Sequence, residues 1–141
     1  MNTIKTRKDV RHLVNVFYAK IRKDELLGPI FNSQISAEKW PEHLNRLTDF
    51  WESNLFGVAK FIGNPSTKHI KVDASMDYTI EQIHFARWLH LWFETIDELY
   101  EGTLATKAKQ SARKMSTGQY LAIWNNRSAK KTKPESESEP D

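Results

Sequence analysis

Five histidines, at positions 12, 43, 69, 84 and 90, are the side chains best suited to hold a metal or move a proton. A zinc site built from protein alone needs three or four converging ligands, commonly with two histidines one helical turn apart. No two histidines here are three or four residues apart, and His84 and His90 fall on different faces of a helix. The chain has no cysteine, which excludes thiolate metal sites, disulfides and thiol catalysis. It also has no G-x-S-x-G motif of the kind that carries a hydrolase nucleophile.

Two of these histidines, His43 and His69, have more informative surroundings. His43 falls on the apolar stripe of residues 40–55, and His69 lies about one turn into a short segment that follows Gly63-Asn64-Pro65. Taken singly, each has an ordinary interpretation, as a histidine at the edge of the core and as a surface residue. Together they put one imidazole on each side of an aromatic-rich gap. A flat iron macrocycle held by one imidazole, with a polar group over its opposite face, needs this layout.

The segments that must position these side chains show helical patterns. Over residues 8–27, apolar residues recur at three- and four-residue steps, which predicts a first helix that Gly28-Pro29 ends. A second helix is predicted from Trp40 or Pro41 to about residue 56, because proline is tolerated only near a helix start. Both helices carry a broad apolar face. Each therefore has to pack against another element of the fold.

The second half of the chain continues this pattern. We expect a brief helix over residues 64–70 and a polar loop over 71–77. Residues 78–100 are apolar on most sides, which predicts a central helix buried on two faces. Thr103 is expected to cap a last helix with mostly small inward residues: Leu104, Ala108, Ala112, Met115, Ala122 and Ile123. Nothing in the sequence alternates as a strand does, so the predicted fold class is all-α.

Length and charge restrict the range of partners. The chain has 141 residues, enough for one domain, and a net charge of +3 with a pI of about 9.1. The basic and acidic residues of the low-complexity stretch 127–141 cancel, and no long basic run remains elsewhere. We therefore expect a domain over residues 1–126, a disordered charged tail over 127–141 and no nucleic-acid partner. Without an apolar signal core or a run of membrane-spanning length, a cytoplasmic protein with no membrane contact is expected.

Four stretches, in order along residues 8–124, resemble the truncated haemoglobins, and among these the third group. They are FYAKIRKDELLGPIFN, the pattern W-x-x-H-x-x-x-L-x-x-F-W from Trp40 to Trp51, GNP-x-x-x-H ending at His69, and RWLHLWFET around Trp88. Each is weak alone, but four in order with matching spacing are specific. The resemblance implies a truncated globin fold, in which two pairs of helices are stacked as a two-over-two sandwich around haem b.

The resemblance also implies a role for individual residues. His69 matches the proximal iron ligand, and Tyr18, His43 and Trp88 match the polar residues on the distal side. Cations near His69 and Trp88 in the sequence, Lys68 and Arg87 among them, are candidates to pair with the haem propionates. The remaining haem-contact residues that it implies are Phe31, Leu47, Phe50 and Trp51. Ordinary core packing is the alternative interpretation for Phe31, Phe50, Trp51 and Trp88.

Such a pocket predicts reversible binding of O2 and other diatomic ligands. A polar distal side also suits activation of peroxide or of reactive nitrogen species, so a haem-based redox enzyme is the alternative. That enzyme would need a separate electron donor, an unidentified reductase, because the chain itself has no reductase domain. A third hypothesis is a haem-free helical interaction module whose aromatic residues are simply its core. Uptake of haem distinguishes this module from the other two.

Overall fold

The computed structural model describes residues 2–58, residue 73 and residues 80–131, with side chains up to residue 126. These residues form helices and, apart from one isolated bridge between Asn2 and Tyr100, no β-structure. The helices are α1 (Arg7–Lys23), α2 (Gly28–Gln34), the 3-10 helix η1 (Ala37–Lys39), α3 (Trp40–Phe56), α5 (Gln82–Leu99) and α6 (Thr103–Lys131). The predicted helix over 64–70, with Lys68 and His69, lies outside the described residues.

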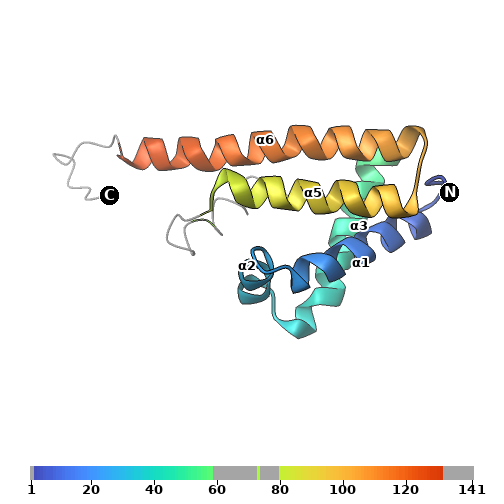
Figure 1. Cartoon of the computed structure of the whole chain (residues 1–141), viewed down its shortest axis with the longest axis horizontal. Coiled ribbons are helices and arrows are strands. Elements are labelled where there is room, and N and C mark those ends of the chain that lie inside the picture. The colour runs from blue at the N-terminus through green and yellow to red at the C-terminus, as the bar shows by residue number, and fades with distance from the viewer. Residues whose placement is uncertain (1, 59–72, 74–79, 132–141) are drawn as a thin grey trace.

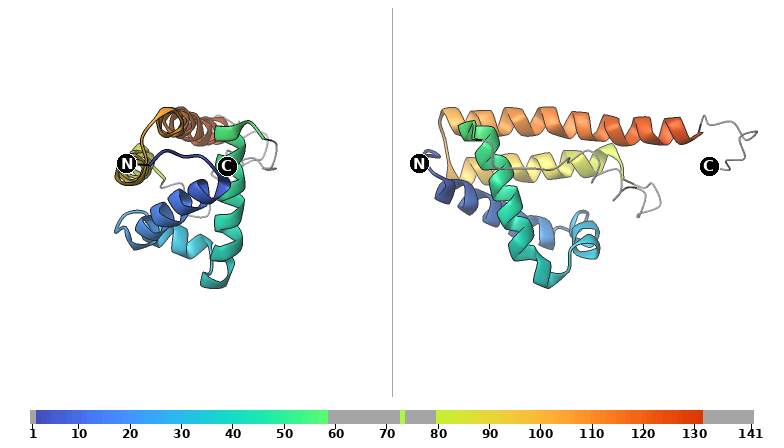
Figure 2. Two further views of the ribbon diagram at one scale, coloured as in Figure 1. Left: turned by 90° about the vertical axis from the view of Figure 1, so that its right-hand side faces the viewer. Right: turned by 180° about the vertical axis from the view of Figure 1, so that it is seen from behind.

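The helices are arranged as two stacked pairs. α1 packs on α3, and α5 packs on α6, which runs antiparallel beside it (Figure 1). The pairs meet because α1 also contacts α5 and α3 also contacts α6, with α3 crossing the long direction of the α5–α6 pair (Figure 2). This arrangement confirms the predicted all-α, two-over-two fold. Among the described helices, none combines the length and apolarity needed to cross a membrane.

The core forms where the pairs meet. The predicted apolar stripe of α1 is fully buried, and so are Trp92 and Ile96 of α5. α5 lies between α1 and α6, as expected for the central helix. The small inward residues of α6 allow a close approach, since the indole N–H of Trp92 donates to the main-chain carbonyl of Ala108 at 3.1 Å. The predicted packing of α6 against its neighbour is therefore confirmed.

The boundary between α1 and α2 differs from the prediction. α1 ends at Lys23, and Gly28-Pro29 begins α2 instead of ending α1. The Asp24 carboxylate stops the first helix by accepting the main-chain N–H groups of Leu26 and Leu27, at 3.1 and 3.0 Å. Gly28 is needed because a Cβ there would lie 2.8 Å from the carbonyl oxygen of Arg22. Proline is well tolerated in a first helical turn, so Pro29 fits the start of α2.

Helix ends in the second half also differ from those predicted. α5 begins at Gln82, where Glu81 and His84 form a reciprocal cap, although the apolar pattern begins at residue 78. Thr103 is the first residue of α6 and not its cap. α6 continues to Lys131, so residues 127–131 are helical where a disordered tail was expected. The sequence from 119 to 131 contains no glycine or proline to interrupt it.

A cavity between the helix pairs

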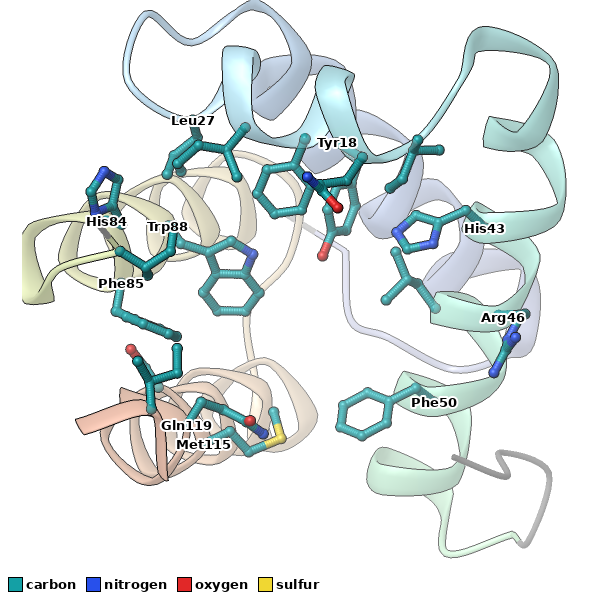
Figure 3. Close-up of a pocket in the computed structure, with 18 of the residues that line it drawn as sticks. Tyr18, Leu27, His43, Arg46, Phe50, His84, Phe85, Trp88, Met115 and Gln119 are labelled. Carbon is teal, nitrogen blue, oxygen red and sulfur yellow. The ribbon is translucent and has the colours of Figure 1, made fainter. Parts of the chain in front are cut away.

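A cavity of about 480 Å³ lies between the two helix pairs, and its wall includes side chains from α1, α2, α3, α5 and α6 (Figure 3). Most of the lining side chains are aliphatic or aromatic, and only a few are polar. Small-molecule and cofactor sites typically have such a volume and an apolar lining with a small number of placed polar groups. The cavity therefore has the dimensions and lining of a binding site.

Most of the site residues predicted from the sequence meet around this cavity. The lining includes Tyr18, Phe31, His43, Leu47, Phe50, Trp51 and Trp88. Three of the predicted residues are placed differently or not at all. Lys68 and His69 lie outside the described residues, and Arg87 does not line the cavity.

Tyr18, His43 and Trp88 form the polar end of the cavity. Tyr18 and His43 approach edge to face with ring centroids 6.2 Å apart, and Trp88 reaches toward them from α5 (Figure 3). Burial raises the pKa of the Tyr18 hydroxyl to about 12, although its hydrogen bond with the Trp88 side chain works in the opposite direction. The hydroxyl therefore keeps its proton at neutral pH. It can donate a hydrogen bond to a small molecule in the cavity.

Phe17 holds two of these polar side chains in place. It is fully buried, and its ring contacts Tyr18 and Trp88 edge-on with centroids 4.7 and 5.1 Å apart. Because neighbouring residues in a helix point in different directions, Phe17 fills the core while Tyr18 turns toward the cavity. His43, Leu47 and Phe50 follow one another at helical spacing along α3, so a single face of α3 supplies that wall.

Arg87, a predicted propionate partner, is paired with Asp24. Its Nε and Nη2 atoms lie 2.8 and 2.7 Å from Asp24 Oδ1, which ties α5 to the connection between α1 and α2. Burial alone would raise the pKa of Asp24. The hydrogen bonds from Arg87 and from the main-chain N–H groups of Leu27 and Leu26 outweigh this effect, so the pKa lies below its ordinary value.

Arg46 is a cation at the cavity that the sequence analysis missed. It lies on α3 one turn after His43, is exposed to solvent and contributes to the lining. Figure 3 shows it between His43 and Phe50. Its three-residue spacing from His43 is a signal that could have identified it.

The α6 side of the cavity was also missed. Met115, Gln119 and Ile123 line the cavity and are spaced by four residues, so one face of α6 forms this wall. Met115 and Ile123 were predicted to point inward, but only as core residues. The side-chain oxygen of Gln119 is buried and has no hydrogen-bond partner within the described part of the chain. An unpaired buried acceptor is costly, which is understandable where a bound molecule completes the wall.

Comparison with known proteins agrees with this architecture. No protein-family model matches the chain. It is 32% identical over 113 residues to the Group 3 truncated hemoglobin ctb of Campylobacter jejuni subsp. jejuni, covering 79% of this chain and 85% of that protein. It also resembles the crystal structure of a group III truncated hemoglobin from Campylobacter jejuni, with a TM-score of 0.77, 29% identity and coverage of 87% of this chain and 95% of that one. The chain therefore belongs to the group III truncated haemoglobins.

Proposed function

We propose that this chain holds haem b in the cavity and reversibly binds O2 and other diatomic ligands there. Membership of the haemoglobin family implies a haem cofactor. The proposal rests above all on one observation, that Tyr18, His43 and Trp88 gather at one end of a mostly apolar cavity. Haem, when bound, supplies an iron atom with a coordination position for a diatomic ligand.

The lining residues fit a flat apolar group with one charged edge. Phe31, Leu47 and Phe50 offer apolar surface to the ring, and Arg46 offers a cation to a propionate. Arg87 is a weaker candidate for a propionate because Asp24 already binds its guanidinium. On the α6 side, Met115 and Ile123 add further apolar surface.

The fifth ligand of the iron is assigned from the sequence. His69 is the proximal ligand in this proposal, and its second ring nitrogen should donate to a nearby acceptor, as histidine ligands usually do. Lys68, its neighbour, remains a candidate to pair with a propionate. Both residues lie outside the described part of the chain, so their roles rest on spacing and on the family resemblance.

Tyr18 and Trp88 retain the ligand in this proposal. Bound O2 carries partial negative charge, and a phenol O–H or an indole N–H can donate a hydrogen bond to it. In a dry cavity such a bond contributes about 1–3 kcal/mol, which is one to two decades in the dissociation rate. Tyr18 suits this role because it is only 4% exposed and keeps its proton at neutral pH. His43 lies beside it and is less buried, so His43 controls entry more than retention.

An absorption series of the purified protein tests the proposal. We expect a Soret band at about 400 nm in the ferric form, with shifts on reduction and on addition of CO that report coordination and ligand binding. A protein that takes up no added haem and shows no Soret band would instead be the haem-free helical module. Shifts on reduction but none with CO would exclude diatomic ligand binding while retaining the cofactor.

Three further expectations accompany this function. The domain is expected to end near residue 126, followed by a charged tail, although α6 itself continues to Lys131. A cytoplasmic location is expected. So is a separate reductase that keeps the iron ferrous, since ferric iron does not bind O2.

A further inference from the structure

Three tryptophans form a stacked column beside the cavity. The rings of Trp51 and Trp92 have centroids 4.5 Å apart at an interplanar angle of 26°, and those of Trp92 and Trp88 are 5.7 Å apart at 17°. Trp51 and Trp88 line the cavity, while Trp92 lies between them and is fully buried. The column therefore has both ends at the cavity and its middle in the core.

We propose that this tryptophan column is a one-electron reservoir, which gives up an electron when the haem-loaded protein reacts with a peroxide. The inference rests on the haem-binding part of the proposed function and not on O2 binding. Indole is among the most readily oxidised of the ordinary side chains. Stacked rings in contact can also share the positive charge that oxidation leaves. A single tryptophan packed among aliphatic residues would lack this second property.

The hydrogen bond of Trp92 determines which oxidised species forms. Its indole N–H donates to the main-chain carbonyl of Ala108 at 3.1 Å, and an amide carbonyl is too weak a base to take the proton. The oxidised indole should therefore keep its proton and remain a cation radical. Tyr18 is the rival donor, because it also lines the cavity and is buried. A phenol, however, must release its proton when it loses an electron.

The electrons and atoms of the step balance with peroxide as the only added oxidant. Hydrogen peroxide takes up two electrons and two protons and leaves as two molecules of water. Of the two electrons, one would come from the bound haem and the other from the tryptophan column, and the two protons would come from solvent. The protein is then two electrons short, one from the haem and one from the column, until an external one-electron reductant returns both in two steps.

Electron paramagnetic resonance of the ferric haem protein, frozen soon after hydrogen peroxide is added, tests this inference. Trp92→Phe should lose most of the organic radical signal. Trp124→Phe is the matched control, since this tryptophan is 53% exposed on α6 and lies outside the column, and it should keep the signal. Equal signals in both variants would overturn the proposal, and so would a signal that only Tyr18→Phe abolishes.

Isotope labelling gives a test that needs no substitution. Protein grown with ring-deuterated tryptophan should show a narrowed radical signal, because hyperfine coupling to the ring hydrogens is reduced. Narrowing with ring-deuterated tyrosine instead would overturn the proposed role of the column while leaving haem binding intact. The Soret band recorded on the same samples separates the two proposals, since a protein without it would overturn both.

Discussion

On the α1–α3 side of the cavity, Tyr18 and His43 are in ring contact, and Trp88 hydrogen-bonds Tyr18 from α5. On the α6 side, Met115 and Ile123 present apolar surface, and Gln119 carries a buried oxygen without a partner among the described residues. Tyr18 and Trp88 are held in place by the fully buried ring of Phe17. The α6 side includes methionine, which adapts readily to its surroundings. Donors held in fixed positions suit hydrogen bonding to a small ligand bound in one orientation. Adaptable side chains suit packing against a large flat molecule.

The change with the largest expected effect removes the proposed iron ligand altogether. His69→Ala should lose most of the haem, because the family resemblance assigns the fifth iron ligand to this residue. His84→Ala is the matched control, since His84 also lines the cavity but its Nδ1 atom accepts the Glu81 N–H at 2.7 Å in the α5 cap. Haem titration with a ferrous–CO spectrum measures both. Full occupancy in His69→Ala, with loss in His84→Ala, would reverse the assignment.

The donor wall itself is tested by Tyr18→Phe and Trp88→Phe. Each variant removes one hydrogen-bond donor and retains an aromatic ring, so each should speed O2 dissociation by about tenfold if a full hydrogen bond is lost. CO dissociation should change less, because bound CO carries less charge. Stopped-flow measurements on the two variants give these rates. Unchanged O2 rates in both would mean that the polar residues serve only as wall.

The sequence reveals the donor wall more readily than the opposite wall. Tyr18, His43 and Trp88 are polar or amphipathic residues on or next to apolar stripes, so their positions stand out. Met115 and Ile123 were correctly placed on the inward face of α6. An inward apolar residue packs equally well against core or against a cofactor, however, so the pattern could not show that this face lines a cavity.

Local helix patterns likewise predicted the core of the fold but not its connections. The apolar stripe of α1 has helical spacing, and burial followed from it. The role of Gly28-Pro29 could not be deduced, because the same pair can end one helix or begin the next. The choice depends on Gly28 approaching the Arg22 carbonyl. The pairing of Arg87 with Asp24 joins residues 63 positions apart, and short-range spacing carries no information on such a contact.

The Arg87–Asp24 pair supports the donor wall from outside, and acid should weaken it. The pKa of Asp24 lies below its ordinary value of 3.8, so its contribution to stability is present above that pH and is lost as the pH falls through the lower, folded-state value. Arg87→Gln should lower the melting temperature near pH 7 and make it less sensitive to acid below pH ~4. Thermal melts from pH 7 to pH ~2.5 measure both effects. If the melting temperature of Arg87→Gln changed with pH just as that of the wild type does, this linkage would be ruled out.

A change of polarity in the α6 wall should alter the O2 dissociation rate far less than the loss of a distal donor does. Gln119→Met removes the unpaired oxygen at similar side-chain length, so O2 dissociation should stay within about twofold of wild type, since no hydrogen bond to the ligand is lost. The same stopped-flow assay used for Tyr18→Phe measures it. An increase as large as that of Tyr18→Phe would mean that donors act from both walls, and the contrast between them would fail.

The smallest effect is expected beyond the end of α6, where neither wall of the cavity is involved. Deleting residues 132–141 should leave the Soret spectrum and the melting temperature unchanged, because the segment contains no apolar residue to bury apart from prolines.

Extending the deletion to 127–141 also removes the last residues of α6, from Arg127 to Lys131. Helix ends fray readily, so this longer deletion should lower the melting temperature only slightly. Absorption spectra and thermal melts of the two truncations make the comparison. A large loss of stability in the shorter one would mean that the tail docks on the fold, and a shifted Soret band would place its contact at the cavity.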